Sequence, residues 1–411
     1  MSRYVLAYSG GLDTSVILKW LQVNHAAEVT TVTADLGQKS EIQGLREKAV
    51  ACGARRVFVD DLRAEFVAGY LWPALQAGAL YQGVYPLATA LGRPLIAKRL
   101  VEVAREVGAD AVVHGCTGKG NDQVRLEVSV AALAPELRCV APLREWEMKT
   151  REEEIAWAHE HGVRVAATKD SPYSIDENLW GVAIECGALE DPWAAPPPDC
   201  WQITAAPESA PDEPREIVIA FREGVPVALD QVALDGPSLI GELNEIAGAH
   251  GVGRLDIVED RLVGIKSREV YEAPAAITLH AAREALEQIT LDRETRRIKA
   301  ELGQQLARLI YDGLWFSPLR ASIQAFVEQA CRPVTGEVRV SLFKGKAIPV
   351  GRRSPCSLYD HHLATYGEGD AFRHTSAQGF IDLFGLGVRT ANAVARRESS
   401  RRPRRVASAA R

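Results

Sequence analysis

A glycine-containing turn near the start of the chain constrains the fold more than any other feature. Tyr4–Tyr8 is a short apolar run typical of a buried parallel strand, and the turn SGGLDTS follows it at residues 9–15. The apolar run from Val16 to Leu21 is then typical of the buried stripe of a helix. Such a turn places a helix N-terminus directly after a strand, where free backbone N–H groups and the helix dipole attract an anion.

The spacing of this turn differs from that of the common phosphate loop. That loop, GxxxxGK followed by Ser or Thr, carries a lysine after its glycines, and no lysine follows Gly11 here. SGGLDTS resembles instead the SGGxDS loop of ATP pyrophosphatases, which cradles pyrophosphate and suits cleavage between the α- and β-phosphates. Thr14 and Ser15 would add hydroxyl donors at the same mouth. An ordinary strand–helix turn with two glycines is the alternative interpretation.

Composition predicts a globular protein with a sizeable core. Of 411 residues, 47% are hydrophobic and 25% are charged, and a prior of roughly 150 residues per domain gives two or three domains. No apolar run reaches the ~20 residues that a membrane span needs, and the early first strand argues against a signal peptide. The seven cysteines form no CxxC pair, so we expect a reducing cytoplasm and no disulfide framework.

Charge is unevenly distributed along the chain. The net charge is −6, although residues 396–411 hold seven arginines and one glutamate. The remainder is therefore acidic, at about −12, which argues against nucleic acid as the main partner. We expect residues 396–411 to be a solvated, disordered tail, with a weak polyanion contact as the alternative.

Strands and helices alternate over residues 1–170 as a doubly wound, mainly parallel α/β sheet requires. Strands are expected at 4–8, 29–35, 57–60, 111–114, 138–141 and 163–166, with helices at 41–52, 62–76 and 94–107. Ligands gather at the carboxyl ends of such strands, so the segments after Tyr8, Ala34 and His114 should form one site. The segment at 115–125, GCTGKGNDQVR, is rich in glycine and polar groups that suit a ligand, with a plain surface loop as the alternative.

The character of the chain changes after residue 170. Residues 171–178 are polar and turn-forming, and the proline-rich stretch from 187 to 214 predicts a linker or wrapping segment. Further strands are expected at 217–221, 225–229, 255–259, 338–343 and 346–350, and helices at 238–249, 277–288, 293–308 and 319–330. We expect a nucleotide-binding domain at 1–170, an α+β domain at 171–375, a terminal helix at 376–395 and the tail at 396–411.

A series of motifs occurs in a fixed order along nearly the whole chain, from about residue 3 to about residue 395. They are AYSGGLDTS, TAD, HGCTGKGNDQVR, SPYSIDENLWG, LEDPW, GVGRLDIVEDRLVGIKSREVYE and YDGLWFSPLR. Together they resemble the argininosuccinate synthase family. The resemblance implies an adenine nucleotide alpha hydrolase-like domain, a synthetase and multimerisation domain, and a C-terminal helical arm that helps to hold a homotetramer.

The resemblance also implies a two-step ligase reaction. The ureido oxygen of citrulline attacks the α-phosphorus of MgATP and gives citrullyl-adenylate and pyrophosphate. The amine of aspartate then displaces AMP and gives argininosuccinate. Mg²⁺ would accompany ATP, and no residue is assigned as a metal ligand. No strong general base is evident. Adenylation that depends on the positioning of the reactants and on electrostatic stabilisation of the phosphates would need little further catalysis.

Site residues follow from the resemblance position by position. ATP would be held by Ala7, Tyr8, Ser9, Gly10, Gly11, Leu12, Asp13, Thr14, Ser15, Ala34 and Gly115. The substrates would be held by Tyr85, Thr89, Thr117, Asn121, Asp122, Arg125, Ser174, Glu259 and Tyr271, with Thr117, Asn121 and Asp122 at aspartate. Asp13, Asp122 and Arg125 are the expected catalytic residues. Arg125 suits a carboxylate because a guanidinium is a planar fork of donors.

Some of these residues have simpler interpretations. Glu259 could pair with Arg254 or Arg261 on a surface, and Tyr271 could belong to the core. Three positions depart from the family pattern. Lys39 stands where many relatives have glycine, and Ala90 and Ala183 stand where many have a serine near citrulline. Each missing hydroxyl would weaken citrulline binding by roughly 0.5–1.5 kcal/mol, although Thr89 would compensate for the one at Ala90.

Two other functions compete with this interpretation. Another ATP pyrophosphatase that adenylates a different substrate usually needs a catalytic cysteine pair, an N-terminal glutaminase cysteine or a basic RNA-binding domain, and none is evident. A non-catalytic nucleotide-binding protein with a decayed site is the second alternative. The presence of Asp13, Asn121, Asp122 and Arg125 argues against decay.

Overall fold

β1 (Arg3–Ala7) is the middle strand of a five-stranded sheet with the order β3-β2-β1-β4-β5 in the computed structural model of this protein. The structure describes residues 2–38, 42, 44–148, 150–163 and 172–401. The other strands are β2 (Glu28–Asp35), β3 (Arg56–Asp61), β4 (Ala111–Val113) and β5 (Arg138–Val140), and all pairings are parallel. Five expected strands are thus confirmed, and the sixth, at 163–166, lies mostly outside the described residues.

Helices cover both faces of this sheet, so the doubly wound prediction is confirmed. On one face lie α1 (Leu12–His25), α2 (Leu45–Ala51) and α8 (Arg151–Glu160), which bury Ile17, Ala49 and Ala158. The opposite face is covered by α5 (Ala88–Val107) and α6 (Asn121–Leu133), with α7 (Pro142–Glu145) after β5. The expected helix at 41–52 is α2, which begins at Leu45.

Two helices differ from the expected ones. The helix expected at 62–76 consists of α3 (Arg63–Phe66), the π-helical turn η1 (Val67–Leu71) and α4 (Trp72–Ala77). The helix expected from residue 94 begins at Ala88, with Pro94 inside it. A proline usually marks the first turn of a helix, but the preceding turn is held by its burial in the core, where Ala88 and Leu91 are at most 1% exposed. Asn121 to Arg125 likewise begin a helix and do not form a loop.

The second half of the chain adds two antiparallel sheets. One has the order β11-β12-β7-β6, formed by β6 (Ser174–Asn178), β7 (Gly181–Glu185), β11 (Arg254–Asp260) and β12 (Lys266–Glu272). The other has the order β10-β9-β8-β13-β14, formed by β8 (Arg215–Arg222), β9 (Val225–Leu229), β10 (Val232–Ala233), β13 (Gly336–Phe343) and β14 (Lys346–Arg353). Residues 174–178, expected to be a turn, are therefore a strand, and β7, β10 and β12 were not expected either.

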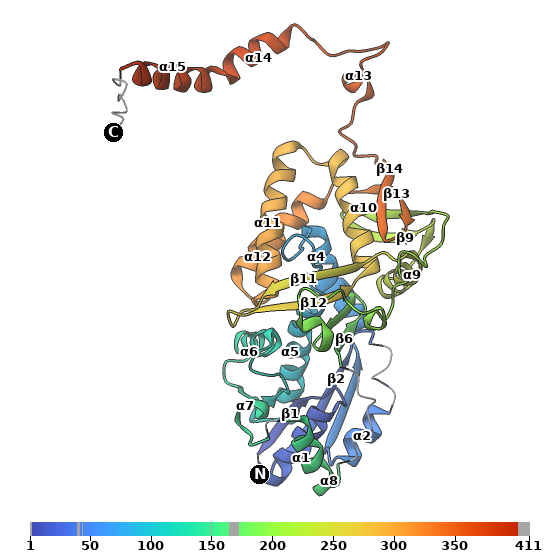
Figure 1. The fold of residues 1–411 in the computed structure, drawn as a ribbon, viewed down its shortest axis with the longest axis vertical. Helices are drawn as coiled ribbons and strands as arrows, with labels where there is room; N and C mark the ends of the chain where they lie inside the picture. Colours follow the sequence, from blue (N-terminus) through green and yellow to red (C-terminus); the bar gives the residue numbers. More distant parts are fainter. Residues whose placement is uncertain (1, 39–41, 43, 149, 164–171, 402–411) are drawn as a thin grey trace, which may run out of the picture. The chain divides into compact units, whose positions relative to one another are not determined.

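Helices α9 (Gly236–Ala249), α10 (Pro274–Thr290), α11 (Arg293–Tyr311) and α12 (Pro318–Cys331) confirm the four expected in this half. The proline-rich stretch contains only two short 3₁₀ turns, η2 (Gly187–Glu190) and η3 (Pro198–Cys200). α5 packs against β1, β2 and β4 of the parallel sheet (Figure 1). It also packs against β6 and β7 of the four-stranded antiparallel sheet. This helix therefore joins the two halves of the site described below.

Residues 1–358 and 359–411 form separate compact units. The second unit contains α13 (His361–Ala364), α14 (Ser376–Phe384) and α15 (Leu386–Arg401). The terminal helix expected at 376–395 is thus two helices, and 396–401, expected to be disordered, are helical; residues 402–411 lie outside the described residues. Among the described helices, none is long and apolar enough to cross a membrane.

Candidate active site

The SGGLDTS turn is held in shape by its own hydroxyl groups. Ser15 Oγ donates to the Gly11 carbonyl at 2.8 Å and lies 3.1 Å from the hydroxyl of Tyr8, while Ser9 Oγ lies 3.2 Å from Thr14 Oγ1. Gly10 has φ +78°, a conformation that favours glycine. Lys48 of α2 donates a hydrogen bond from Nζ to the Gly10 carbonyl, so a positive charge lies beside the turn.

A cavity of about 310 Å³, here called the loop cavity, opens at the carboxyl ends of β1, β2 and β4. Six of the residues predicted to hold ATP line it: Ala7, Tyr8, Ser9, Thr14, Ala34 and Gly115. The three strand ends thus meet at one site, as expected. The other predicted residues of the turn do not line this cavity. Ser15 is 1% exposed and its hydroxyl faces the interior, so its place is behind the turn and not at its mouth.

A smaller cavity of about 70 Å³, here called the polar cavity, lies between α6 and the sheet β11-β12-β7-β6. It is lined by Thr89, Gly120, Asn121, Asp122, Arg125, Ser174, Asp176, Ala183, Glu185, Glu259, Arg261, Glu269 and Tyr271. Seven of the nine residues predicted to hold substrate are among them. The two exceptions are Tyr85, which is buried behind the cavity and stacked on Tyr271 at 3.9 Å, and Thr117, which is exposed. Asp176 lines both cavities, so they adjoin there.

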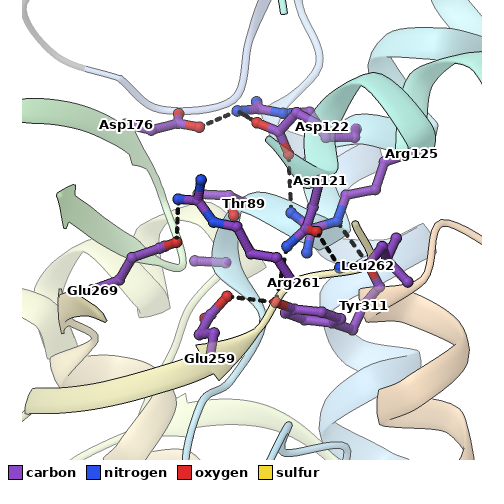
Figure 2. A network of polar contacts seen from close by, with 12 residues as sticks. Thr89, Asn121, Asp122, Arg125, Asp176, Glu259, Arg261, Leu262, Glu269 and Tyr311 are labelled. Atoms are coloured by element: carbon purple, nitrogen blue, oxygen red, sulfur yellow. Dashed lines mark hydrogen bonds and ion pairs between the residues drawn. The ribbon is translucent and has the colours of Figure 1, made fainter. Parts of the chain in front are cut away.

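Arg125 and Asp122 are held together in the first turns of α6 (Figure 2). Arg125 Nη1 donates to Asp122 Oδ1 at 2.9 Å, and its Nε donates to the carbonyl of Tyr311 at 2.9 Å. The other oxygen of Asp122 accepts from Arg93 at 2.7 Å. Burial acts to raise the pKa of Asp122, but Arg93 and Arg125 outweigh it and hold this pKa well below its usual value. Asp122 is therefore a carboxylate at neutral pH.

Glu259 faces the polar cavity from the end of β11. Tyr311 donates to its Oε2 at 2.7 Å, and the hydroxyl of Tyr271 bonds its Oε1 and also lies 2.5 Å from Glu269 Oε2. Burial and then the charge of Glu269 raise the pKa of Glu259 to about 7. The hydroxyl of Tyr271 has one proton for two carboxylates, which agrees with the raised pKa of Glu259. Glu259 is 2% exposed and Arg261 pairs with other carboxylates, so the surface-pair interpretation of Glu259 is wrong. Tyr271 lines the cavity and also belongs to the core, as its simpler interpretation expects.

Sequence reasoning missed several charged residues of the polar cavity. Arg261 follows β11 and pairs with Glu269 at 2.9 Å (Figure 2). It also pairs with Glu185. Asp176 lies on β6, and Arg93 on α5 pairs with it. Asp176, Arg261 and Glu269 lie within the motifs that resemble the family. Their spacing alone does not distinguish them from charged residues on the surface.

The positions that depart from the family pattern differ in their surroundings. Ala183 lines the polar cavity and is 7% exposed. Ala90 is fully buried and lines neither cavity. Thr89, directly before Ala90, lines the polar cavity, and its Oγ1 lies 3.1 Å from the hydroxyl of Tyr85. Lys39 lies outside the described residues.

Both halves of the chain match known families. Residues 3–164 match a family described as the arginosuccinate synthase N-terminal HUP domain, and residues 173–391 match the arginosuccinate synthase C-terminal domain. The first match contains most residues of the loop cavity and the second contains most residues of the polar cavity, while the loop-cavity residues 175–178 fall in the second match.

Whole-length relatives give the same result. The argininosuccinate synthase of Chlorobaculum tepidum is 57% identical over 397 residues, which cover 96% of this chain and 99% of that protein. The argininosuccinate synthase of Chlorobium phaeobacteroides is 57% identical over 388 residues, covering 94% of this chain and 97% of that protein. A solved U34-tRNA thiolase from Methanococcus maripaludis is far more distant, with 15% identity and a TM-score of 0.26 over 42% of this chain and 60% of that one.

Proposed function

The chain belongs to the argininosuccinate synthase family, and we propose how its two cavities divide the work of an enzyme that ligates citrulline and aspartate at the expense of ATP in arginine biosynthesis. The observation that carries the proposal is the shared wall at Asp176, where the loop cavity and the polar cavity adjoin. An adenylation needs this arrangement, because the α-phosphorus and the attacking oxygen must meet at one point.

ATP would occupy the loop cavity. Its phosphates would lie at the N-terminus of α1, where Gly10 and Gly11 permit a close approach and Lys48 adds a positive charge beside the turn. Its adenosine would lie along Ala34 and Gly115. The predicted roles of Leu12 and Asp13 fit the same placement, since both begin α1.

Mg²⁺ would be held mainly by the phosphates of ATP. Among the described residues there is no group of three or more His, Cys, Asp or Glu side chains that could hold a metal ion. Mg²⁺ in nucleotide sites keeps several waters and takes one or two carboxylates. Asp13, which has Glu154 beside it, would supply such a carboxylate. When bound, Mg²⁺ neutralises charge on the departing pyrophosphate.

Citrulline and aspartate would share the polar cavity. Arg125 offers donors to an α-carboxylate, while Asp122 and Glu259 offer acceptors to α-amino groups. In the first step the ureido oxygen bonds to the α-phosphorus as the bond to pyrophosphate breaks. In the second step the aspartate amine bonds to the ureido carbon, and AMP leaves with the former ureido oxygen.

Pyrophosphate release from MgATP, with citrulline and aspartate each omitted in turn, tests this function. We expect release to require citrulline, and argininosuccinate to appear only when aspartate is added. ATP binding without pyrophosphate release in the presence of both amino acids would support a non-catalytic protein instead.

The apparent KM for citrulline should depend on pH through Glu259. Its pKa is raised to about 7, first by burial and then by Glu269, so the carboxylate that attracts an ammonium group is lost as the pH falls below about 7. KM should then rise by up to roughly tenfold per pH unit. Steady-state kinetics from pH 6 to 8 measure this slope. An unchanged slope in Glu259→Gln would assign the titration to another group.

Restoring a hydroxyl at Ala183 should strengthen citrulline binding. Ala183 lines the polar cavity, and one added hydrogen bond of about 0.5–1.5 kcal/mol would lower KM by roughly 2- to 12-fold in Ala183→Ser. Ala90→Ser is the matched control. Ala90 is fully buried away from the cavity, so its hydroxyl should give no gain in affinity. Equal KM values for both variants and the parent protein would contradict this placement.

A homotetramer is proposed from the surface of the C-terminal unit. α14 leaves Phe380, Ile381, Leu383 and Phe384 between 58% and 77% exposed, an apolar surface that further copies of the chain would cover. Sedimentation should give a tetramer for the full chain and smaller species for Leu383→Asp/Phe384→Asp. Gln378→Ala on the same helix should remain tetrameric. A monomer at micromolar concentration of the full chain would reject the proposal.

A reducing cytoplasm is proposed as the location. All seven cysteines are free thiols in the structure, as a reducing compartment requires.

A further inference from the structure

Arg93 stands at the boundary between the two cavities. It lies on α5, the helix that packs against both the parallel sheet and β6–β7, and its side chain is 17% exposed. It lines the loop cavity, while its two partners, Asp122 and Asp176, line the polar cavity. No role for Arg93 follows from the sequence motifs described above.

The contacts of Arg93 leave part of its guanidinium available. Its Nη2 donates to Asp122 Oδ2 at 2.7 Å and also to Asp176. Within the described part of the chain, these are the hydrogen bonds that Arg93 makes, and both use Nη2. Its Nε and Nη1 are therefore the donors that remain for a ligand. Among the described residues that line the loop cavity, Arg93 is the only lysine or arginine.

Adenylation requires positive charge at this position. The bond from the ureido oxygen to the α-phosphorus forms while the bond to the bridging oxygen breaks, and the electron pair leaves with pyrophosphate. The ureido group keeps its protons and becomes cationic, so no base is consumed. Charge on the non-bridging α-oxygens must be stabilised where the cavities adjoin, which is at Asp176, a direct partner of Arg93.

We propose that Arg93 is a catalytic residue that donates a hydrogen bond to a non-bridging oxygen of the α-phosphate during adenylation. A guanidinium suits this task because it binds two carboxylates on one side and a phosphate oxygen on the other, within one plane. The inference rests on the proposed function, since it assigns the α-phosphate to the boundary of the two cavities.

The test compares ATP with the two diastereomers of ATPαS, in which sulfur replaces one or the other non-bridging α-oxygen. Citrulline-dependent exchange of labelled pyrophosphate into ATP measures adenylation alone. The parent protein should discriminate between the diastereomers. Arg93→Met should exchange about 100-fold more slowly or worse with ATP, and its discrimination between diastereomers should diminish. Arg93→Lys keeps the charge but should also change the ratio of the exchange rates with the two diastereomers. This variant replaces Arg93→Met in the test if Arg93→Met does not fold.

A purely structural role predicts a different pattern. If Arg93 only neutralises Asp122 and Asp176, adding Asp176→Asn to Arg93→Met should restore exchange, and the diastereomer ratio should match that of the parent protein. That result would overturn the inference about Arg93. The proposed function would still stand, because the parent protein catalyses the exchange. No exchange by the parent protein would instead reject the proposed function together with the inference drawn from it.

Discussion

Replacing Arg125 with alanine is expected to abolish citrulline saturation while ATP binding survives. Arg125 is 4% exposed, bonds Asp122 and the carbonyl of Tyr311, and lines the polar cavity and not the loop cavity. Removing one member of a buried charge pair costs about 2–5 kcal/mol, so KM for citrulline should rise at least about 30-fold. The measurement is pyrophosphate release against citrulline concentration, with ATP affinity determined separately.

Arg144→Ala is the matched control for this variant. Arg144 pairs with Glu127 of the same helix α6 but lines neither cavity, so its removal should leave citrulline saturation unchanged. Unchanged citrulline saturation in Arg125→Ala would remove Arg125 from the substrate site. Equal loss of ATP affinity would show that the variant disturbs the fold.

Replacing Gly10 with alanine is expected to weaken ATP binding while the polar cavity remains intact. Gly10 has φ +78°, and a Cβ there would lie 2.1 Å from Cδ2 of Leu45, the residue that begins α2. The backbone strain alone costs about 1–3 kcal/mol, so ATP affinity should fall by roughly tenfold or more as the turn changes shape. Equilibrium binding of ATP measures the effect.

Gly83→Ala separates backbone strain from the specific role of the turn. Gly83 has a nearly equal φ of +79°, but a Cβ there would meet no atom within 4 Å. Its substitution should lower the free energy of unfolding and leave ATP affinity unchanged. If both variants bind ATP as the parent protein does, the SGGLDTS turn is not the phosphate site.

The three central strands of the parallel sheet, β1, β2 and β4, were predictable because they are buried on both faces. Val5, Val29 and Val112 are at most 2% exposed, and such strands appear in the sequence as continuous apolar runs. In the four-stranded antiparallel sheet, β11 was predicted, at 255–259, whereas β6, β7 and β12 were not. Residues 174–178 are mostly polar because they face a cavity, so they resemble a turn. The start of α5 was missed because Pro94 lies within the helix and not at its beginning.

The residues of the site likewise differ in how far the sequence predicts them. Residues at strand ends, such as Ala34 and Gly115, follow from the general geometry of parallel sheets. The polar cavity depends on contacts between distant segments: Asn121 donates to Tyr311 at 2.8 Å and accepts from the N–H of Leu262 at 2.9 Å. No local pattern predicts such contacts, and the resemblance to a family indicated Asn121 but neither of these two partners. Neither the geometry of strand ends nor the family resemblance indicated Arg93. Its partners are 29 and 83 residues away in the sequence, so no local pattern connects them.

Citrulline labelled with ¹⁸O in its ureido group tests the central claim most directly, which is that citrulline attacks the α-phosphorus of ATP where the two cavities adjoin. After turnover with aspartate, mass spectrometry of the products locates the label. An adenylate intermediate predicts that the label appears in the phosphate of AMP and is absent from pyrophosphate. Unlabelled AMP, with the label in pyrophosphate or inorganic phosphate, would contradict attack at the α-phosphorus and with it the proposed arrangement of ATP and citrulline.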